Sequence, residues 1–277
     1  MSELLKFSPE ETRILNRFNF YYYVSHKNKF IYVNNFKVAS TAFINAIVDI
    51  EDLKEPPPSY PPFYHPPHRI LSTGLVFPEL SRLIENKGYL AFAATRHPIL
   101  RLFSSWGSTF LGFNNSLRLF YSLSEKDRTA ENIRLLFDNY VQALHDNPVS
   151  RLEVHCIPQY IYLRIDKVKY THLLKIEEVD FFIDDLYLRF RVAKNPTPHL
   201  NLNYIPYEAD YISAKSANII YKIYEADFRI FGYDKVVPSN PTGAPIEINY
   251  LGLKEKLIYF GLLGPDETEK TDKEGGL

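Results

Sequence analysis

The sequence has almost no cysteine and no long apolar run, and each shortage excludes a class of protein. Its single cysteine, Cys156, can form neither an internal disulfide nor a multi-cysteine metal site, which indicates a reducing compartment. The longest apolar runs fall far short of the roughly 18 residues that a membrane-spanning helix needs. The first residues contain no apolar stretch of the kind found in signal peptides. We therefore expect a cytoplasmic protein with no integral membrane segment.

An excess of charge is lacking as well. The formal net charge is −1 at pH 7, so the composition does not indicate binding to nucleic acid or to an anionic membrane. With 45% hydrophobic and 23% charged residues, the chain can build a large core. Acidic residues are in excess near the end, between residues 264 and 277. We predict one domain over residues 1–262, followed by an acidic, disordered tail over residues 263–277.

Segments with strand-like and helix-like spacing alternate along the chain, which predicts an α/β fold. Residues 1–28 are expected to hold an N-terminal helix, starting at Ser8, and a strand of a hairpin. Proline is concentrated in an extended loop at residues 56–67, which holds 7 of the 19 prolines. The expected strands are 19–25, 29–34, 69–72, 89–95 and 170–176, and the expected helices are 41–50, the segment from Ile99, 130–145, 179–191 and 207–228. This order predicts a single-domain, three-layer α/β/α sandwich with a mostly parallel central sheet.

The first candidate site is a P-loop-like strand-loop-helix in which a buried strand leads into the loop Lys37–Thr41. Backbone N–H groups and the positive end of the helix dipole suit a phosphate there, and Lys37, Ser40 and Thr41 add a charge and hydroxyl donors. In the alternative, Ser40 or Thr41 only caps the helix and Lys37 is a solvated loop residue. The segment is not a Walker A loop, because it contains no glycine and its lysine precedes the hydroxyl residues by three positions.

The second candidate site is the end of the strand 89–95. Arg96 follows this strand, and Pro98 begins the helix that carries Arg101 and Ser104. Ligands of parallel α/β sheets bind at the carboxyl ends of the strands, where a guanidinium can bind a phosphate through two hydrogen bonds. Ser104 can add a hydroxyl donor. In the alternative, Arg96 and Arg101 form structural ion pairs.

Together these segments resemble the cofactor motifs of sulfotransferases that use 3′-phosphoadenosine 5′-phosphosulfate (PAPS), in particular the carbohydrate sulfotransferase family and its bacterial relatives. The family motif Lys-x-x-Ser-Thr matches Lys37–Thr41, and Arg-x-Pro-x-x-Arg-x-x-Ser matches Arg96–Ser104. Three further segments match in order, namely His-x-x-Pro-Gln at 155–159, a strand, glutamate and helix at 170–186, and Tyr-x-x-Asp-Phe-x-x-Phe-Gly-Tyr at 224–233. The chain departs from the family pattern at His97 and in the proline-rich loop. These two departures affect the expected identity of the acceptor and not that of the cofactor.

This resemblance implies the PAPS sulfotransferase fold and transfer of a sulfuryl group to a hydroxyl of a carbohydrate or glycoconjugate. It places the 5′-phosphosulfate on the loop residues Lys37, Val38, Ala39, Ser40, Thr41 and Ala42, and the 3′-phosphate on Arg96 and Ser104. Lys37 is also expected to stabilise the leaving group, so PAPS is the co-substrate and no metal is required.

The acceptor hydroxyl also needs a general base, for which histidine has the most suitable pKa. We favour His65 or His68, because uronyl 2-O-sulfotransferases carry a similar aromatic-Tyr-His segment in which a histidine is the base. In the alternative, both are exposed loop residues. His155 and Gln159 are expected to contact the acceptor, with His155 as the reserve base. His97 is expected to support the site from behind, and Glu177 to be structural.

Three other functions remain open. A kinase or nucleotide hydrolase on a similar sheet would bind a nucleoside triphosphate with magnesium, but the chain lacks the glycine loop and a strand-end aspartate. A non-catalytic module of the same fold would bind a glycan or a partner. A sulfotransferase of a non-carbohydrate small molecule would keep the cofactor motifs. Golgi relatives carry a membrane anchor and disulfides, and this sequence shows neither feature, so we expect a bacterial cytoplasmic enzyme. The sequence does not indicate the oligomeric state.

Overall fold

The computed structural model describes Ser8, Pro9, Glu11 and Ile14 and the residues 21–53, 77–107, 125–147, 153–194 and 205–239. Ser8 and Glu11 form the reciprocal capping box that the sequence predicts, with the Glu11 N–H bonded to Ser8 Oγ at 3.2 Å and the Ser8 N–H to Glu11 Oε2 at 2.5 Å. The proline-rich loop, the strand expected at 69–72, both of its neighbouring histidines (His65 and His68) and the acidic tail lie outside the described residues.

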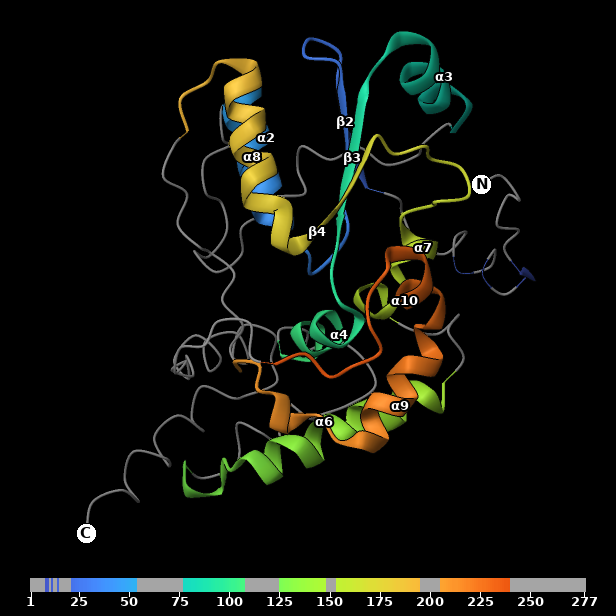
Figure 1. Ribbon diagram of the computed structural model, residues 1–277, viewed down its shortest axis with the longest axis vertical. Helices are drawn as coiled ribbons and strands as arrows, with labels where there is room; N and C mark the ends of the chain where they lie inside the picture. Colours follow the sequence, from blue (N-terminus) through green and yellow to red (C-terminus); the bar gives the residue numbers. More distant parts are fainter. Residues whose placement is uncertain are drawn as a thin grey trace, which may run out of the picture.

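The described strands form one mixed sheet in the order β1-β2-β3-β4 (Figure 1). These strands are β1 (Tyr22–Ser25), β2 (Phe30–Val33), β3 (Leu90–Thr95) and β4 (His172–Lys175). β1 pairs antiparallel with β2 as a hairpin, whereas β2, β3 and β4 are parallel, with Phe30 opposite Leu90 and Phe92 opposite His172. The mostly parallel sheet predicted from the sequence is therefore confirmed, and the carboxyl ends of β2, β3 and β4 share one edge.

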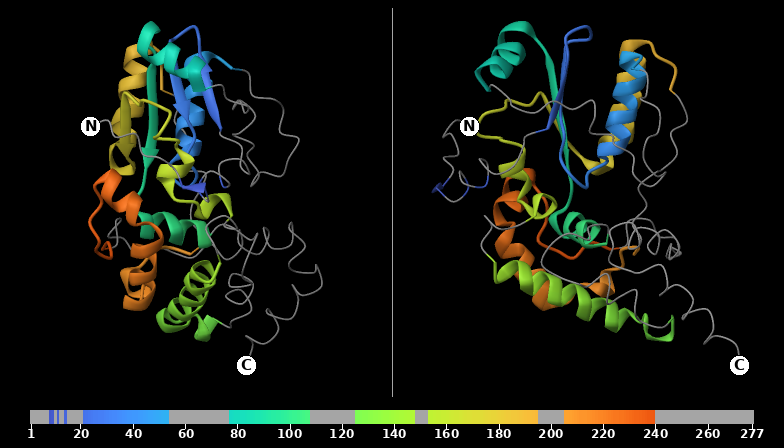
Figure 2. Two further views of the ribbon diagram at one scale, coloured as in Figure 1. Left: turned by 90° about the vertical axis from the view of Figure 1, so that its right-hand side faces the viewer. Right: turned by 180° about the vertical axis from the view of Figure 1, so that it is seen from behind.

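Both faces of the sheet are covered by helices, because successive strand residues point to opposite sides. Phe30, Tyr32 and Phe92 pack in one cluster with residues of α2 (Ser40–Glu51) and α8 (Val179–Phe190), two helices that lie side by side in Figure 2. Ile31 and Ala91 pack in another cluster, with residues of α3 (Phe77–Lys87) and α7 (Gln159–Tyr162). The sheet and the helices on its two faces are the three layers of the α/β/α sandwich.

A third cluster is helical and lies beyond the carboxyl edge of the sheet (Figure 1). It joins α4 (Pro98–Trp106), α6 (Ala130–His145) and α9 (Ala214–Ile223), with the ring of Phe103 5.2 Å from both Trp106 and Phe137. α4 starts directly after Arg96 and His97, so this cluster fixes the helix on which the second candidate motif lies.

The observed helices differ from the expected ones in several places, of which the short helix α7 is one. α3 was not anticipated, and the single helix expected over 207–228 is broken into a short 3-10 turn (Ala209–Tyr211), α9 and α10 (Glu225–Phe231). The break falls at Tyr224, whose hydroxyl donates to the Cys156 carbonyl at 2.6 Å. Tertiary contacts of Tyr224 and Asp227, which the spacing of apolar residues does not encode, account for the break.

We predict that Phe43→Ala lowers the free energy of unfolding by about 3–5 kcal/mol. Phe43 is fully buried, and its ring lies 5.0 Å from Tyr32 and 5.6 Å from Phe92. Phe181→Ala is the matched control, because Phe181 is 80% exposed on α8, and a change within about 0.5 kcal/mol is expected. Urea unfolding followed by circular dichroism measures both. Equal effects of the two substitutions would contradict the layer assignment.

Candidate active site

The loop after β2 has a strained backbone at two residues. Lys37 (φ 66°) and Ala39 (φ 57°) both adopt the left-handed conformation, although neither is glycine. This conformation costs about 1–2 kcal/mol per residue, and residues held in it cluster at ligand-binding loops. The surrounding structure therefore keeps the loop in a shape that local preference opposes.

The N-terminus of α2 has no side-chain cap. Its N-cap residue is Ala39, and Ser40, the first helical residue, instead donates its hydroxyl proton to the Asn35 carbonyl at 2.7 Å. The interpretation of Ser40 or Thr41 as a simple cap therefore does not hold. Because the N–H groups of a first helical turn have no intrahelical acceptor, residues 40–42 present a donor set suited to an anion. By contrast, α4, α6 and α9 are capped by the side chains of His97, Thr129 and Ser213.

The Arg96 side chain joins the two candidate motifs. Its Nη1 donates to the Lys37 carbonyl at 3.4 Å, so the strand-end arginine lies against the loop after β2. Burial lowers the pKa of Arg96 to about 10, a shift that Glu177 and Tyr233 oppose and Arg101 assists. The guanidinium therefore stays charged at neutral pH. Among the described residues no carboxylate forms a salt bridge with Arg96 or Arg101, which counts against the structural ion-pair alternative.

Arg101 is buried beneath the same loop. It is 2% exposed, and its Nε and Nη1 donate to the carbonyls of Phe36 (3.0 Å) and Ile157 (2.8 Å). Through these bonds α4 holds the loop after β2 and the short 3-10 helix η4 (Val154–Cys156) in fixed relation. Both partners are neutral carbonyls, so the positive charge of Arg101 adds to that of Lys37 and Arg96.

Gln159 fixes the main chain of Arg96. Its Oε1 accepts from the Arg96 N–H at 3.0 Å, and its Nε2 donates to the Arg96 carbonyl at 2.8 Å. The same Oε1 accepts from Asn35 Nδ2 at 3.1 Å, and Asn35 also donates to the Ala94 carbonyl at 2.9 Å. Gln159 is fully buried, so the expectation that it contacts the acceptor is replaced by a positioning role.

Asp227 in turn holds the start of α7. Its two carboxyl oxygens accept from the N–H groups of Gln159 (2.8 Å) and Tyr160 (2.9 Å). Burial raises the pKa of Asp227 to about 6, which these two hydrogen bonds and Arg101 oppose. A line of hydrogen bonds therefore runs from Asp227 through Gln159 to Arg96, and on through Asn35 to the loop after β2.

His155 lies on η4 beside the loop. Its Nδ1 bonds to Glu153 Oε1, its N–H bonds to Glu153 Oε2 at 3.1 Å, and its ring lies 4.7 Å from that of Phe36. Burial lowers the pKa of His155, and Lys37 and Arg101 lower it further, while Glu153 raises it. The charge of Lys37 therefore disfavours protonation of His155.

His97 lies at the start of α4, where main-chain groups hold its ring. Its Nδ1 accepts from the Ile99 N–H at 3.3 Å, and its Nε2 pairs with the Asp234 carbonyl at 3.0 Å. Both ring nitrogens are thus engaged by the main chain, and burial lowers the pKa of His97. Ser104, on the following turn of α4, is buried.

Several buried polar atoms of these motifs have no hydrogen-bond partner among the residues that the structure describes. They are Asn34 Nδ2, Asn35 Oδ1, Arg96 Nε and Arg101 Nη2. Buried polar atoms are nearly always paired, so such a group in a native structure calls for a ligand or a water. Three of these four atoms are donors, and two belong to guanidinium groups. These donors suit an anionic ligand.

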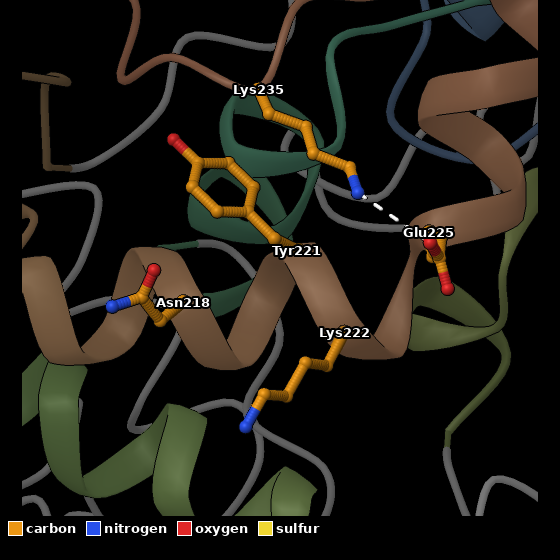
Figure 3. A pocket seen from close by; sticks show the side chains of 5 residues that line it. All are labelled: Asn218, Tyr221, Lys222, Glu225 and Lys235. Atoms are coloured by element: carbon orange, nitrogen blue, oxygen red, sulfur yellow. Dashed lines mark ion pairs between the residues drawn. The ribbon is translucent and has the colours of Figure 1, made fainter.

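A separate hollow lies between α9, α10 and the segment after Gly232 (Figure 3). Asn218, Tyr221 and Lys222 line it, with Glu225 and Lys235 forming an ion pair of 3.6 Å at its edge. None of these residues belongs to the loop after β2, to α4 or to η4, and the two cations are not directed at a common point in Figure 3.

The structure thus brings Arg96 and His155 to the loop after β2. Ser104 lies buried on α4. Other members of the site were missed as functional residues, namely Asn35, Arg101, Glu153 and Asp227. Signals for three of them were present, because Asn35 directly follows the strand expected at 29–34, Arg101 lies inside the Arg-x-Pro-x-x-Arg-x-x-Ser motif and Asp227 lies inside the Tyr-x-x-Asp-Phe motif. The carbonyl partners of Arg101 depend on tertiary structure. The partner of Glu153 is local, but no motif marks it.

Comparison with known proteins identifies the class. The model of a family described as the Sulfotransferase family matches residues 21–234, and the chain belongs to this family. No curated protein and no solved structure matched the chain. No helix in the described part of the chain is long and apolar enough to cross a membrane. The protein is a sulfotransferase, and this family typically uses PAPS.

We predict that Gln159→Leu lowers the free energy of unfolding by about 2–4 kcal/mol, because it leaves the N–H and carbonyl of Arg96 buried without partners. Gln142→Leu on the exposed face of α6 is the control, with an expected change below about 0.5 kcal/mol. Urea unfolding measures both. If the two substitutions destabilise the protein equally, the Gln159 amide does not hold Arg96.

Proposed function

We propose that this enzyme transfers a sulfuryl group from PAPS to a hydroxyl of a carbohydrate or glycoconjugate. The observation that carries the proposal is the meeting of an uncapped helix N-terminus, Lys37 and the Arg96 guanidinium at one sheet edge. A sulfotransferase needs such a donor set to bind the phosphates of its nucleotide. In this proposal the enzyme works in the bacterial cytoplasm, which rests on the sequence alone.

The residues of the loop hold the 5′ end of the donor in this proposal. The first-turn N–H groups of α2 bind the 5′-phosphate, with Val38 and Ala39 forming the turn and Ser40, Thr41 and Ala42 supplying donors. Lys37 neutralises the charge that grows on the bridging oxygen when the sulfuryl group departs. No covalent intermediate and no metal enters this proposal, because Lys37 and the helix N-terminus supply the neutralisation.

Arg96 and Ser104 hold the 3′-phosphate. The guanidinium is positioned from behind by Gln159, which holds its main chain, and Ser104 follows on α4, two turns after the strand end. Such preorganisation lowers the cost of ordering the site when the donor binds.

The acceptor hydroxyl gives its proton to a histidine in this mechanism. The sequence favours His65 or His68, which lie outside the described residues. The resemblance of the motifs to those of carbohydrate sulfotransferases supports a carbohydrate acceptor. The alternatives are a non-carbohydrate acceptor and a non-catalytic module that binds a glycan, and the experiments below separate them.

We predict that wild-type protein binds 3′-phosphoadenosine 5′-phosphate and that Arg96→Ala and Lys37→Ala each weaken binding by about 10- to 100-fold, as expected for a lost charged hydrogen bond. Isothermal titration calorimetry measures the dissociation constants. Arg82→Ala and Lys194→Ala, which remove exposed ion-paired cations, are the controls and should leave binding unchanged. Absence of wild-type binding at millimolar nucleotide would overturn the proposed function, and magnesium-dependent binding of ATP would favour a phosphoryl-transferring enzyme.

We also predict that a panel of sugars incubated with sulfate-labelled PAPS yields a labelled sugar, and that Lys37→Ala lowers the turnover number by about 100- to 1,000-fold. Chromatography of the products measures the transfer. Labelled product only with non-carbohydrate hydroxyl compounds would reassign the acceptor class. Binding of the nucleotide without transfer to any compound would support the non-catalytic module.

A further inference from the structure

We propose that His155, oriented by Glu153, is the group that takes the proton from the acceptor hydroxyl. This inference rests on the proposed function and assigns the base to the described part of the site, in place of His65 and His68. It also gives Glu153, which the sequence did not single out, the role of a positioning residue.

The hydrogen bonds of His155 leave one ring nitrogen suited to accept a proton. A carboxylate bonded to Nδ1 holds the proton on that nitrogen and leaves the lone pair on Nε2. The carboxylate is itself fixed, because its other oxygen accepts from the main-chain N–H of His155 at 3.1 Å. Within the described part of the chain, Nε2 of His155 has no hydrogen-bond partner. A histidine oriented by a carboxylate is the arrangement of general bases in many unrelated enzymes.

The ring of His155 lies beside the loop that carries Lys37. It packs against Phe36, the residue before Lys37, with 4.7 Å between ring centroids. Arg101 donates to the carbonyls of Phe36 and of Ile157, two residues after His155, so one guanidinium holds both segments. The base and the lysine assigned to the leaving group are therefore fixed relative to each other, as an in-line transfer requires.

The charges around His155 favour its neutral form. Burial lowers the pKa of His155 below its usual value of 6.5, and Lys37 from the loop and Arg101 from α4 act in the same direction. Glu153 on its own segment opposes them. His155 is therefore unprotonated at neutral pH, which is the form that a general base needs.

The other described histidines lack this arrangement. Both ring nitrogens of His97 are engaged by the main chain. His145 also pairs with a carboxylate, that of Asp146 at 3.1 Å, but at an exposed position at the end of α6. His26 is bonded to the Tyr89 hydroxyl at the far end of β2, in the hairpin turn. His172 lies on β4 and is exposed.

The proposed step balances without any further reactant. Nε2 of His155 takes the acceptor proton as the acceptor oxygen forms a bond to sulfur. The bond from sulfur to the bridging oxygen breaks, and its electron pair stays on the 5′-phosphate of the departing nucleotide, beside Lys37. The imidazolium, stabilised by Glu153, then releases its proton to water.

The test compares His155→Ala with His145→Ala in the full chain. The assay measures release of 3′-phosphoadenosine 5′-phosphate from PAPS, with water as acceptor and with any sugar that the panel identifies. We expect the turnover number of His155→Ala to fall by about 100- to 10,000-fold, with the nucleotide dissociation constant within about twofold of wild type and partial rescue by added imidazole. His145→Ala should match the wild type.

The pH profile of Glu153→Gln provides a second test, which does not depend on the alanine variant folding. In the wild type, activity should be lost as the pH falls through the His155 pKa, which lies below 6.5. Because Glu153 raises this pKa, its replacement by neutral glutamine should move the acid limb to lower pH and reduce turnover about tenfold. An unmoved acid limb would contradict the proposal.

The decisive contrary result is wild-type turnover in His155→Ala, with collapse in His65→Ala or His68→Ala. That result would return the base to the loop and leave the proposed function intact. Failure of the proposed function itself is distinguishable, because the wild-type protein would then not bind 3′-phosphoadenosine 5′-phosphate at all.

Discussion

The pair of hydrogen bonds between the Gln159 amide and the main chain of Arg96 is the interaction on which the rest of the site depends. Arg96 lies between the end of β3 and the start of α4. There the Gln159 amide bonds to the main-chain N–H and carbonyl of Arg96, as a neighbouring strand would do within the sheet. Gln159 is held by Asp227 and also receives the amide of Asn35. Segments that are far apart in the sequence therefore meet at one buried side chain, and the position of the Arg96 guanidinium follows from it.

The second constraint is electrostatic. Lys37, Arg96 and Arg101 lie around one loop, and Arg101 donates to neutral carbonyls. Burying these charges opposes folding, because burial is the main cause of the lowered pKa of Arg96 and the charge of Arg101 lowers that pKa further. The left-handed backbone of Lys37 and Ala39 adds strain, which also opposes folding. In the proposed function, bound phosphates would offset this cost, so the site would have lower stability in exchange for a pre-formed anion pocket.

Sequence reasoning predicted much of this structure. The strand periodicity, the Ser8 capping box and the two candidate phosphate motifs are local signals. The sheet, the sandwich and the contact of Arg96 with Lys37 follow from them. The break at Tyr224 and the burial of Gln159 depend on contacts between distant segments. The pairing of Glu153 with His155 is local, but no motif in the sequence marks it. A buried glutamine and a substrate-binding glutamine look alike in sequence, because only the fold decides whether the amide faces solvent or a main chain.

The central claim is that the ammonium of Lys37 and the guanidinium of Arg96 hold the two phosphate-bearing ends of one nucleotide. A crystal structure of the protein with 3′-phosphoadenosine 5′-phosphate tests this claim most directly. The account predicts the 5′-phosphate on the N–H groups at the start of α2 with Nζ of Lys37 beside it, and the 3′-phosphate on Arg96 and Ser104. A nucleotide bound elsewhere, with both cations directed away from it, would contradict the account.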